Sequence, residues 1–329
     1  MGRLVSVDVC SGAGGLALGL ERAGFDPALL LDNKPIACET LRRNRPTWNV
    51  FETDLLDFDP INNPEPYNPD AFDVDLLSAG LPRVKSSATT GRVETGLELR
   101  LLKAAVLLAA HVVQPKAFLV ENVPDLVTAE EFEEVRDFIQ SELVHLKYKF
   151  HWFILNAADF GVPQDRKQGV LVALKDPFFD RFRAPTPTTT HHITAGEALL
   201  PSMSARGWHG AEEWATRANR VAPTLVGGSD KRGGADLGLT GTKKTWAQMG
   251  INGGALSDEV PGPDGTQESD TSGSPLKKLT VEQTAVLQSF PDDWIFAGKK
   301  TARYRQIGHA SPPPVGEALG RAIADALRG

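Results

Sequence analysis

Cysteine is nearly absent from this chain, which contains only two thiols, Cys10 and Cys38, in 329 residues. So few thiols provide neither a disulfide framework nor a cysteine-based metal cluster, and we expect no metal site. Cys10 follows a predicted strand and Cys38 lies in a predicted helix, so we interpret both as packing residues. Free thiols are typical of a reducing compartment, and we expect a cytoplasmic protein.

The chain also lacks an excess of positive charge, because 35 lysines and arginines face 42 aspartates and glutamates. The net charge of -7 excludes a protein that coats nucleic acid through a general basic field, but it is compatible with a local basic cleft. Long apolar runs are missing as well. No stretch approaches the ~20 apolar residues of a membrane span, and none has the pattern of a secretory leader, so we expect no membrane segment.

Short apolar runs alternate with helical patterns over the first part of the chain. The predicted strands are Leu4–Val9, Leu29–Asp32, Val50–Asp54, Val74–Ser78, Ala117–Val120, Lys149–Leu155 and Gly169–Leu174. The predicted helices are Leu16–Ala23, Pro35–Asn44, Leu97–Val113, Glu130–Leu143, Leu279–Phe290 and Val315–Leu327. This alternation predicts an α/β fold, with a doubly wound, mostly parallel sheet that is covered on both faces.

The character of the sequence changes after about Asp180. Residues 184–275 are rich in proline, threonine and glycine and have few long apolar periodicities, which predicts a smaller, irregular domain. We therefore divide the chain into a cofactor-binding domain (1–183), a small domain (184–275) and a C-terminal segment that returns to the first domain (276–329). Within the small domain, Gly227–Gly241 and Ser257–Pro275 are predicted loops, and the second is expected to be the most mobile part.

A glycine-rich turn follows the first predicted strand. Ser11-Gly-Ala-Gly-Gly15 separates Val9 from the helix that starts near Leu16. In a strand–turn–helix unit of this kind, the turn amides and the helix N-terminus lie where a cofactor binds. Asp32 falls about 20 residues beyond the turn, the usual place of a ribose-binding carboxylate. A glycine turn that serves packing alone is the alternative interpretation.

Further motifs make the pattern specific from Glu121-Asn-Val123 onward. The chain resembles the C5-cytosine DNA methyltransferases of bacterial modification systems over nearly its whole length. The matching motifs, in the order of that family, are Asp8-Val-Cys-Ser-Gly-Ala-Gly-Gly15, Phe118-Leu-Val-Glu-Asn-Val-Pro124, Asn156-Ala-Ala-Asp-Phe-Gly-Val-Pro-Gln-Asp-Arg166, Arg220-Val-Ala-Pro-Thr-Leu225, Leu279-Thr-Val-Glu-Gln283, Phe290-Pro-Asp-Asp293, Tyr304-Arg-Gln-Ile-Gly308 and Pro312-Pro-Pro-Val315. The resemblance implies a methyltransferase sheet, a small target-recognition domain, and double-stranded DNA in the cleft between them.

The resemblance also implies a cofactor, S-adenosylmethionine, and a set of residues that hold it. Asp32 corresponds to the acidic residue at the ribose hydroxyls, and Asp54 corresponds to the one near the adenine. The cofactor-binding set implied in this way comprises Asp8, Cys10, Ser11, Gly12, Gly14, Gly15, Leu16, Asp32, Asn33, Asp54, Leu55, Ser78 and His309. We expect a monomer, and whether a restriction or modification partner exists is left open.

One departure from the family concerns the catalytic nucleophile. The family places a cysteine in Gly-Pro-Pro-Cys-Gln, whereas the matching stretch here is Ala79-Gly-Leu-Pro-Arg-Val-Lys85, with Arg83 at the cysteine position. In this chemistry a thiolate adds to cytosine C6, which builds electron density at C5 for methyl transfer. A guanidinium offers no lone pair for such an attack. Lys85 would need strong desolvation to act instead, and Ser86 and Ser87 are weak nucleophiles without an evident base.

The remaining site residues implied by the family carry the target base and the DNA. Glu121 and Arg166 are expected to be catalytic, together with Arg83 at the nucleophile position; a phosphate or base contact is the alternative role of Arg83. Two further departures are Gln168, where a second arginine is common, and His309, where the family has asparagine. The expected DNA-binding residues are Arg83, Lys85, Arg220, Lys231 and Arg232.

Three functions follow from this combination. The first is a cytosine-5 DNA methyltransferase that flips its target base out of the duplex. The second is a catalytically silent DNA-binding or regulatory homologue that keeps the cofactor pocket. The third is a methyltransferase that acts on another substrate by direct transfer and needs no thiolate.

Overall fold

A computed structural model describes residues 2–64, 73–84, 96–228, 234–267 and 275–329. Lys85, Ser86, Ser87, Lys231 and Arg232 lie outside the described residues, as do parts of the two predicted loops in the small domain. The chain forms two compact units. Unit 1 comprises residues 1–155, 167–186 and 315–329, and unit 2 comprises residues 156–166 and 187–314. The predicted three-part division stays a prediction.

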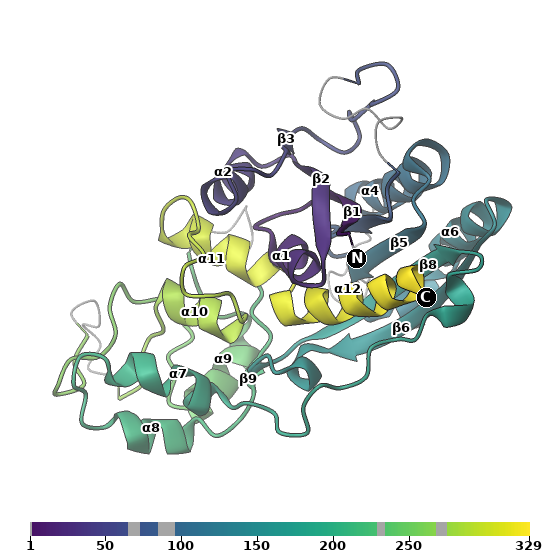
Figure 1. Cartoon of the computed structure of the whole chain (residues 1–329). Coiled ribbons are helices and arrows are strands. Elements are labelled where there is room, and N and C mark those ends of the chain that lie inside the picture. Colours follow the sequence, from purple (N-terminus) through teal and green to yellow (C-terminus); the bar gives the residue numbers. More distant parts are fainter. Residues whose placement is uncertain (1, 65–72, 85–95, 229–233, 268–274) are drawn as a thin grey trace. The chain divides into compact units, whose positions relative to one another are not determined.

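Unit 1 is built on a seven-stranded sheet of described strands in the order β3-β2-β1-β4-β5-β8-β6. The strands are β1 (Leu4–Val9), β2 (Phe25–Asp32), β3 (Val50–Glu52), β4 (Leu76–Ala79), β5 (Ala117–Asn122), β6 (Tyr148–Asn156) and β8 (Lys167–Lys175). Neighbouring strands from β3 to β5 pair in parallel, whereas β8 runs antiparallel to β5. The predicted α/β fold with a mostly parallel sheet is therefore confirmed (Figure 1).

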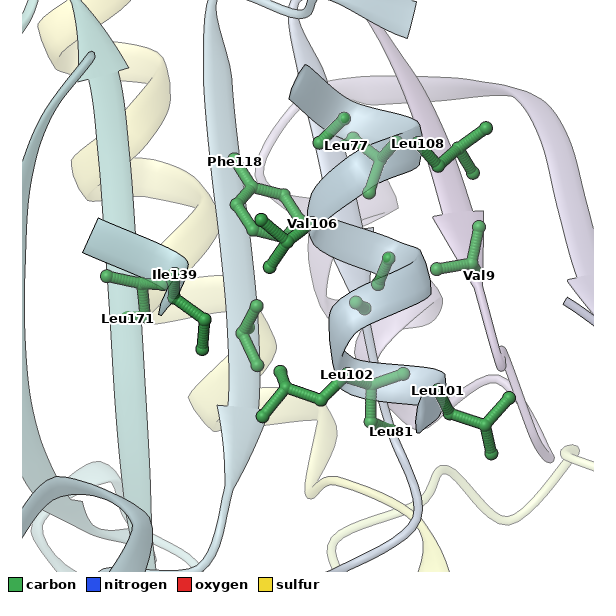
Figure 2. Packing of buried hydrophobic residues seen from close by; sticks show 14 of the residues in the cluster. Val9, Leu77, Leu81, Leu101, Leu102, Val106, Leu108, Phe118, Ile139 and Leu171 are labelled. Atoms are coloured by element: carbon green, nitrogen blue, oxygen red, sulfur yellow. The ribbon is translucent and has the colours of Figure 1, made fainter. Parts of the chain in front are cut away.

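Successive side chains on a strand point to opposite faces of the sheet, so each face packs against its own layer of helices. One face is apolar: Val9 and Leu77 pack with Phe118 beneath Leu102 and Val106 of α4 (Gly96–Leu107), as Figure 2 shows. Ile139 of α6 (Glu133–His145) extends the same cluster toward Leu171 of β8. This continuous apolar layer fixes the register of the strands and hence the positions of the residues at their ends.

The opposite face is covered by α1 (Gly15–Arg22) and α12 (Pro313–Arg328). These two helices lie so close that a Cβ added at Gly320 of α12 would approach the Ala23 Cβ to 2.7 Å. Glycine at this position lets the C-terminal helix pack directly on the first helix. The carboxyl-terminal residues 315–329 thus belong to the same unit as β1, although they are at the other end of the sequence.

The remaining helices of unit 1 include several that differ from the predicted pattern. They are α2 (Pro35–Asn44), α5 (Asp125–Thr128), the short 3-10 helices Glu130–Phe132 and Phe179–Arg181, and the π-helix Leu108–Val113. The single helix predicted for Leu97–Val113 is instead an α-helix that changes to the wider π-helical turn at Leu108. The predicted strand of residues 29–32 also starts earlier, at Phe25.

Unit 2 contains short helices and a small two-stranded sheet. Its elements are a 3-10 helix (Ala157–Phe160), β7 (Gln164–Asp165), α7 (Ala195–Ser204), α8 (Ala211–Arg217), β9 (Ala222–Pro223), α9 (Thr240–Gln248), α10 (Val281–Leu287) and α11 (Lys300–His309). Capping boxes at Thr194 and Thr280 start α7 and α10, since each hydroxyl accepts from a backbone amide three residues later. None of the helices in the described part of the chain has the length and apolar character that a membrane span requires.

Candidate functional site

Acidic side chains gather at the carboxyl ends of the parallel strands in unit 1. Asp8 of β1 pairs in register with Ser78 of β4, so both side chains point to the face that α1 and α12 cover. Asp32 at the end of β2 and Glu121 in β5 share this face by the same alternation. The carboxyl ends of parallel strands are where α/β proteins bind their ligands. This edge is therefore the candidate cofactor site.

The glycine-rich turn lies at the same edge and is held by Asp32. The Asp32 carboxylate accepts hydrogen bonds from the backbone amides of Gly12 and Lys34, each at 2.8 Å. Gly12 and Gly14 have positive φ angles of 53° and 85°, which favour glycine. A Cβ added at Gly12 would meet no heavy atom of the described residues within 4 Å, so the space beside the Gly12 Cα is open. Burial raises the pKa of Asp32 above its ordinary value, and the two amide bonds oppose this effect.

Asp8 lies below the turn and is 1% exposed. Its Oδ1 accepts a hydrogen bond of 2.8 Å from the Ser78 hydroxyl, and the Ser11 hydroxyl donates to the Asp8 backbone carbonyl at 2.9 Å. Its Oδ2 is buried and has no hydrogen-bond partner among the described residues. Burial raises the pKa of Asp8 to about 7, with the charges of Asp32 and Glu121 adding to the effect.

The second acidic position, Asp54, follows β3. One carboxylate oxygen accepts from the Leu56 amide and the other from the Asn33 side-chain amide, each at 2.9 Å. Asn33 is exposed, whereas Leu55 is buried in the apolar core. Ser11, Leu16 and the adjoining glycines complete the edge around the start of α1. The cofactor-binding role of these residues stays a prediction.

The loop after β4 carries Arg83, and Asn122 fixes this loop from β5. The Asn122 side-chain oxygen accepts from the Val84 amide at 3.0 Å, and its Nδ2 donates to the Pro82 carbonyl at 3.3 Å. Asn122 is 5% exposed, so both bonds are shielded from water. One buried amide therefore holds the backbone on both sides of Arg83.

Arg83 is subject to the negative charge of Glu121. Burial lowers the pKa of Arg83, and the negative charge of Glu121 opposes this effect. Glu121 also accepts a hydrogen bond from the Gln168 side-chain amide, which projects from the neighbouring strand β8. Gln168 is buried, with 2% exposure. The charge of the expected catalytic glutamate thus acts on Arg83, the residue at the position of the nucleophile.

Arg166 lies in unit 2, where its guanidinium is 1% exposed. It donates to the backbone carbonyls of Leu225 at 3.1 Å, Gly308 at 3.1 Å and Ala310 at 3.0 Å. These carbonyls come from separate segments of unit 2, so the side chain ties those segments together. The predicted catalytic role of Arg166 stays a prediction.

The other expected site residues of unit 2 are exposed. His309 ends α11 and lies beside Gly227, where an added Cβ would come within 2.7 Å of the His309 ring. Arg220 is exposed, and its guanidinium lies 3.5 Å from the Gln248 side-chain oxygen. The remaining predicted DNA contacts, Lys85, Lys231 and Arg232, fall outside the described residues.

The structure adds residues that the sequence did not single out. Asn122 was noted only as part of a motif, yet it holds the Arg83 loop. Gln164 and Gln288 form a buried pair beside Arg166: Gln164 accepts from the Leu225 amide at 2.9 Å and donates to the Leu287 carbonyl at 3.1 Å. Buried amides inside motifs are the only sequence signal for such roles, because their partners lie far along the chain.

Neither thiol of the chain is poised to ionise. Cys10 lies in the turn, where burial and the nearby charges of Asp32 and Asp8 raise its pKa well above the ordinary value. Burial raises the pKa of Cys38 to about 11, and its thiol donates to the Asp32 carbonyl at 3.5 Å. Both cysteines of the sequence are therefore protonated at neutral pH.

Known proteins share both the sequence and the fold. The family of C-5 cytosine-specific DNA methylases matches residues 4–325. The Type II methyltransferase M.NaeI of Lentzea aerocolonigenes is 42% identical over 332 residues, which cover 99% of this chain and 76% of that protein. The Type II methyltransferase M.NgoMIV of Neisseria gonorrhoeae is 39% identical over 330 residues, which cover 99% of each chain.

Solved structures of methyltransferases have the same fold. The Entamoeba histolytica methyltransferase EhMeth has a TM-score of 0.66 at 14% identity, with 100% of both chains covered. The S. pombe Dnmt2 methyltransferase has a TM-score of 0.63 at 15% identity, with 99% of this chain and 100% of that chain covered. Together with the sheet and the acidic strand ends, these matches define a methyltransferase fold. The chain belongs to the C-5 cytosine-specific DNA methylase family.

Proposed function

We propose that this protein binds S-adenosylmethionine and double-stranded DNA as its family does, but does not attack cytosine through a thiolate. Membership of a cytosine-5 methyltransferase family supports both ligands. The observation that carries the second part is the environment of Arg83. Arg83 stands in the loop after β4, the charge of Glu121 acts on its guanidinium, and Asn122 holds the loop backbone at Pro82 and Val84.

The residues at the carboxyl edge of unit 1 fit the cofactor. The open side of Gly12 leaves room for a ligand, and the buried Asp8 Oδ2 lacks a protein partner. Asp32 would hold the turn through its bonds to backbone amides and would accept hydrogen bonds from the ribose hydroxyls with its remaining lone pairs. Asp54 and Leu55 would border the adenine. When bound, S-adenosylmethionine supplies an electrophilic methyl group. The protein's part is to orient this group and to exclude water.

The target base would meet an altered set of groups. Glu121 could accept from the exocyclic amine of a flipped cytosine, and its bond from Gln168 fixes the carboxylate in place. The nucleophilic step has no candidate among the described residues, because Arg83 cannot donate an electron pair and both thiols remain protonated. The proposed outcome is a protein that binds the base without covalent addition at C6.

A trapping experiment tests this proposal. The wild-type protein is incubated with S-adenosylmethionine and duplex DNA that carries 5-fluorocytosine, and the products are separated under denaturing conditions. We expect no covalent complex, since trapping requires a nucleophile bonded to C6. Labelled cofactor with ordinary duplex DNA reports turnover in parallel.

The Arg83→Cys variant provides the matched comparison. An adduct formed by the variant but not by the wild type would support a pocket that lacks only its nucleophile. A wild-type adduct that survives denaturation would refute the proposal and direct attention to Lys85. Methyl transfer by the wild type without an adduct would refute the silent function and favour direct transfer to another acceptor. Gln168 and His309 also differ from the family pattern, so the test of Arg83→Cys is adduct formation and not recovery of methyl transfer.

A further inference from the structure

The buried Asp8 carboxylate is an incompletely satisfied polar group at the candidate cofactor site. One oxygen is used by Ser78, and the other is buried without a hydrogen-bond partner in the described structure. A buried polar atom without a partner typically costs about 1–3 kcal/mol. Such an atom needs a physical explanation, and a ligand that binds beside it is one such explanation.

The charges around Asp8 favour a positively charged ligand. The charged groups of the described residues that act on it are Asp32 on β2 and Glu121 on β5, and both are negative. The adjacent strand β4 contributes only the neutral hydroxyl of Ser78, and the turn contributes the Ser11 hydroxyl and the protonated Cys10 thiol. Without an added cation, an ionised Asp8 would be an uncompensated buried charge. With a pKa of about 7, the carboxyl group of the free protein avoids part of this cost at neutral pH and most of it at lower pH, where it is protonated.

We propose that Asp8 is the counter-ion for a cationic group of the bound cofactor, and that binding releases the proton that its carboxyl group holds in the free protein. The inference rests on the proposed function, because it requires S-adenosylmethionine at this edge. The O–H bond of the carboxyl group breaks, its electron pair stays on the carboxylate, and the proton passes to the buffer. Cofactor affinity then rises with pH, since less free energy is needed to remove the proton.

Calorimetry on the full chain tests the linkage. S-adenosylmethionine is titrated into the protein at pH 6, 7 and 8 in two buffers of different ionisation enthalpy, which gives the number of protons released. For a carboxyl group with a pKa of about 7, release should be about half a proton at pH 7, larger at pH 6 and smaller at pH 8. The affinity should rise about tenfold between pH 6 and pH 8.

Two variants isolate the contribution of Asp8. Asp8→Asn keeps the size of the side chain but cannot release this proton, so only titration of the ligand itself should remain. Asp75→Asn is the matched control, because Asp75 is also buried but lies before β4, at the opposite end of the strand, and bonds to Lys116 and the Val5 amide, each at 2.8 Å. The Asp75→Asn variant should release as many protons on cofactor binding as the wild type does.

S-adenosylhomocysteine serves as the second ligand, because it keeps the ammonium group but lacks the sulfonium charge. Proton release with both ligands supports pairing with the shared ammonium, and release with S-adenosylmethionine alone supports pairing with the sulfonium. Binding of both ligands by the wild type without Asp8-dependent release overturns the inference and leaves the proposed function standing. If neither ligand binds, the proposed function fails and the inference fails with it.

Discussion

At the scale of single residues, Arg83 changes what the loop after β4 can recognise. A guanidinium donates hydrogen bonds in a fixed planar fork and therefore suits phosphate oxygens or base acceptors. Glu121 balances part of its charge, so Arg83 is not an isolated buried cation. The same position that loses nucleophilic chemistry can thus contribute to DNA binding.

The Arg83→Ala variant should weaken binding to duplex DNA by roughly 1–3 kcal/mol, the usual range for an arginine contact to a base edge. Cofactor affinity should change less, since Arg83 is not among the groups around the glycine turn. Anisotropy of a labelled duplex and calorimetry with cofactor measure the two affinities. Arg321→Ala is the control, because Arg321 is exposed on α12 and pairs with Glu317. Equal losses in both affinities would contradict this assignment.

Asp8 should also affect stability, and the sign follows from its raised pKa. Between about pH 4 and pH 7 the native state keeps a proton that the unfolded state releases, so unfolding becomes easier as the pH rises through this window. Asp8→Asn removes this dependence. At pH 8 without cofactor, the variant should unfold at a higher urea concentration than the wild type, and its free energy of unfolding should be larger by up to about several kcal/mol. At pH 4 the two proteins should differ little.

The control for that measurement is Asp75→Asn, which loses an ion pair with Lys116 and should be less stable than the wild type at pH 8. If Asp8→Asn is less stable than the wild type at pH 8, the interactions of the ionised carboxylate stabilise the native state by more than its desolvation destabilises it, and the prediction is wrong.

At the scale of elements, local patterns predicted much of the structure because they depend on nearby residues. The bounds of β1 and α2 agree with the prediction, since strand alternation and helical spacing are local signals. The early start of β2 was missed because Pro27 argues against a strand interior. The structure accommodates Pro27 where the register with β1 shifts between Ser6 and Val7. The π-helical turn at Leu108 was missed because an apolar run gives the same signal for both helix types.

Arg166 joins elements that are distant in sequence, and removing it should loosen unit 2. Arg166→Met deletes the donors to the Leu225, Gly308 and Ala310 carbonyls while keeping much of the apolar side-chain length. Chemical denaturation should show that the free energy of unfolding falls by about 3 kcal/mol or more, because the three carbonyls would stay buried without their hydrogen-bond donors. Arg166→Lys should lose less, and Arg321→Met is the exposed control. Wild-type stability in Arg166→Met would mean that water replaces the guanidinium.

At the scale of the whole molecule, the sequence motifs predicted the fold but not the assignment of residues to the two units. Arg166 and Gln168 are neighbours in one motif, yet they belong to unit 2 and unit 1 respectively. The contacts of Asn122 with the Arg83 loop depend on adjacent strands β4 and β5, whose pairing a single sequence does not specify. Motifs indicate which residues act together, while burial and hydrogen bonding decide how each one acts.

The net charge of -7 makes the salt dependence of DNA binding informative for the whole chain. An acidic protein must bind DNA through a limited set of cations, because no general basic field assists it. Arg220 is exposed, and its guanidinium lies 3.5 Å from the Gln248 side-chain oxygen, so it is accessible to a phosphate. Each phosphate contact contributes about 0.9 to the slope of log affinity against log salt concentration. Arg220→Ala should therefore reduce the magnitude of that slope by about one and weaken binding similarly for unrelated duplexes, as measured by anisotropy over a salt series. Arg321→Ala should leave the slope unchanged, and an unchanged slope for Arg220→Ala would remove Arg220 from the DNA-binding set.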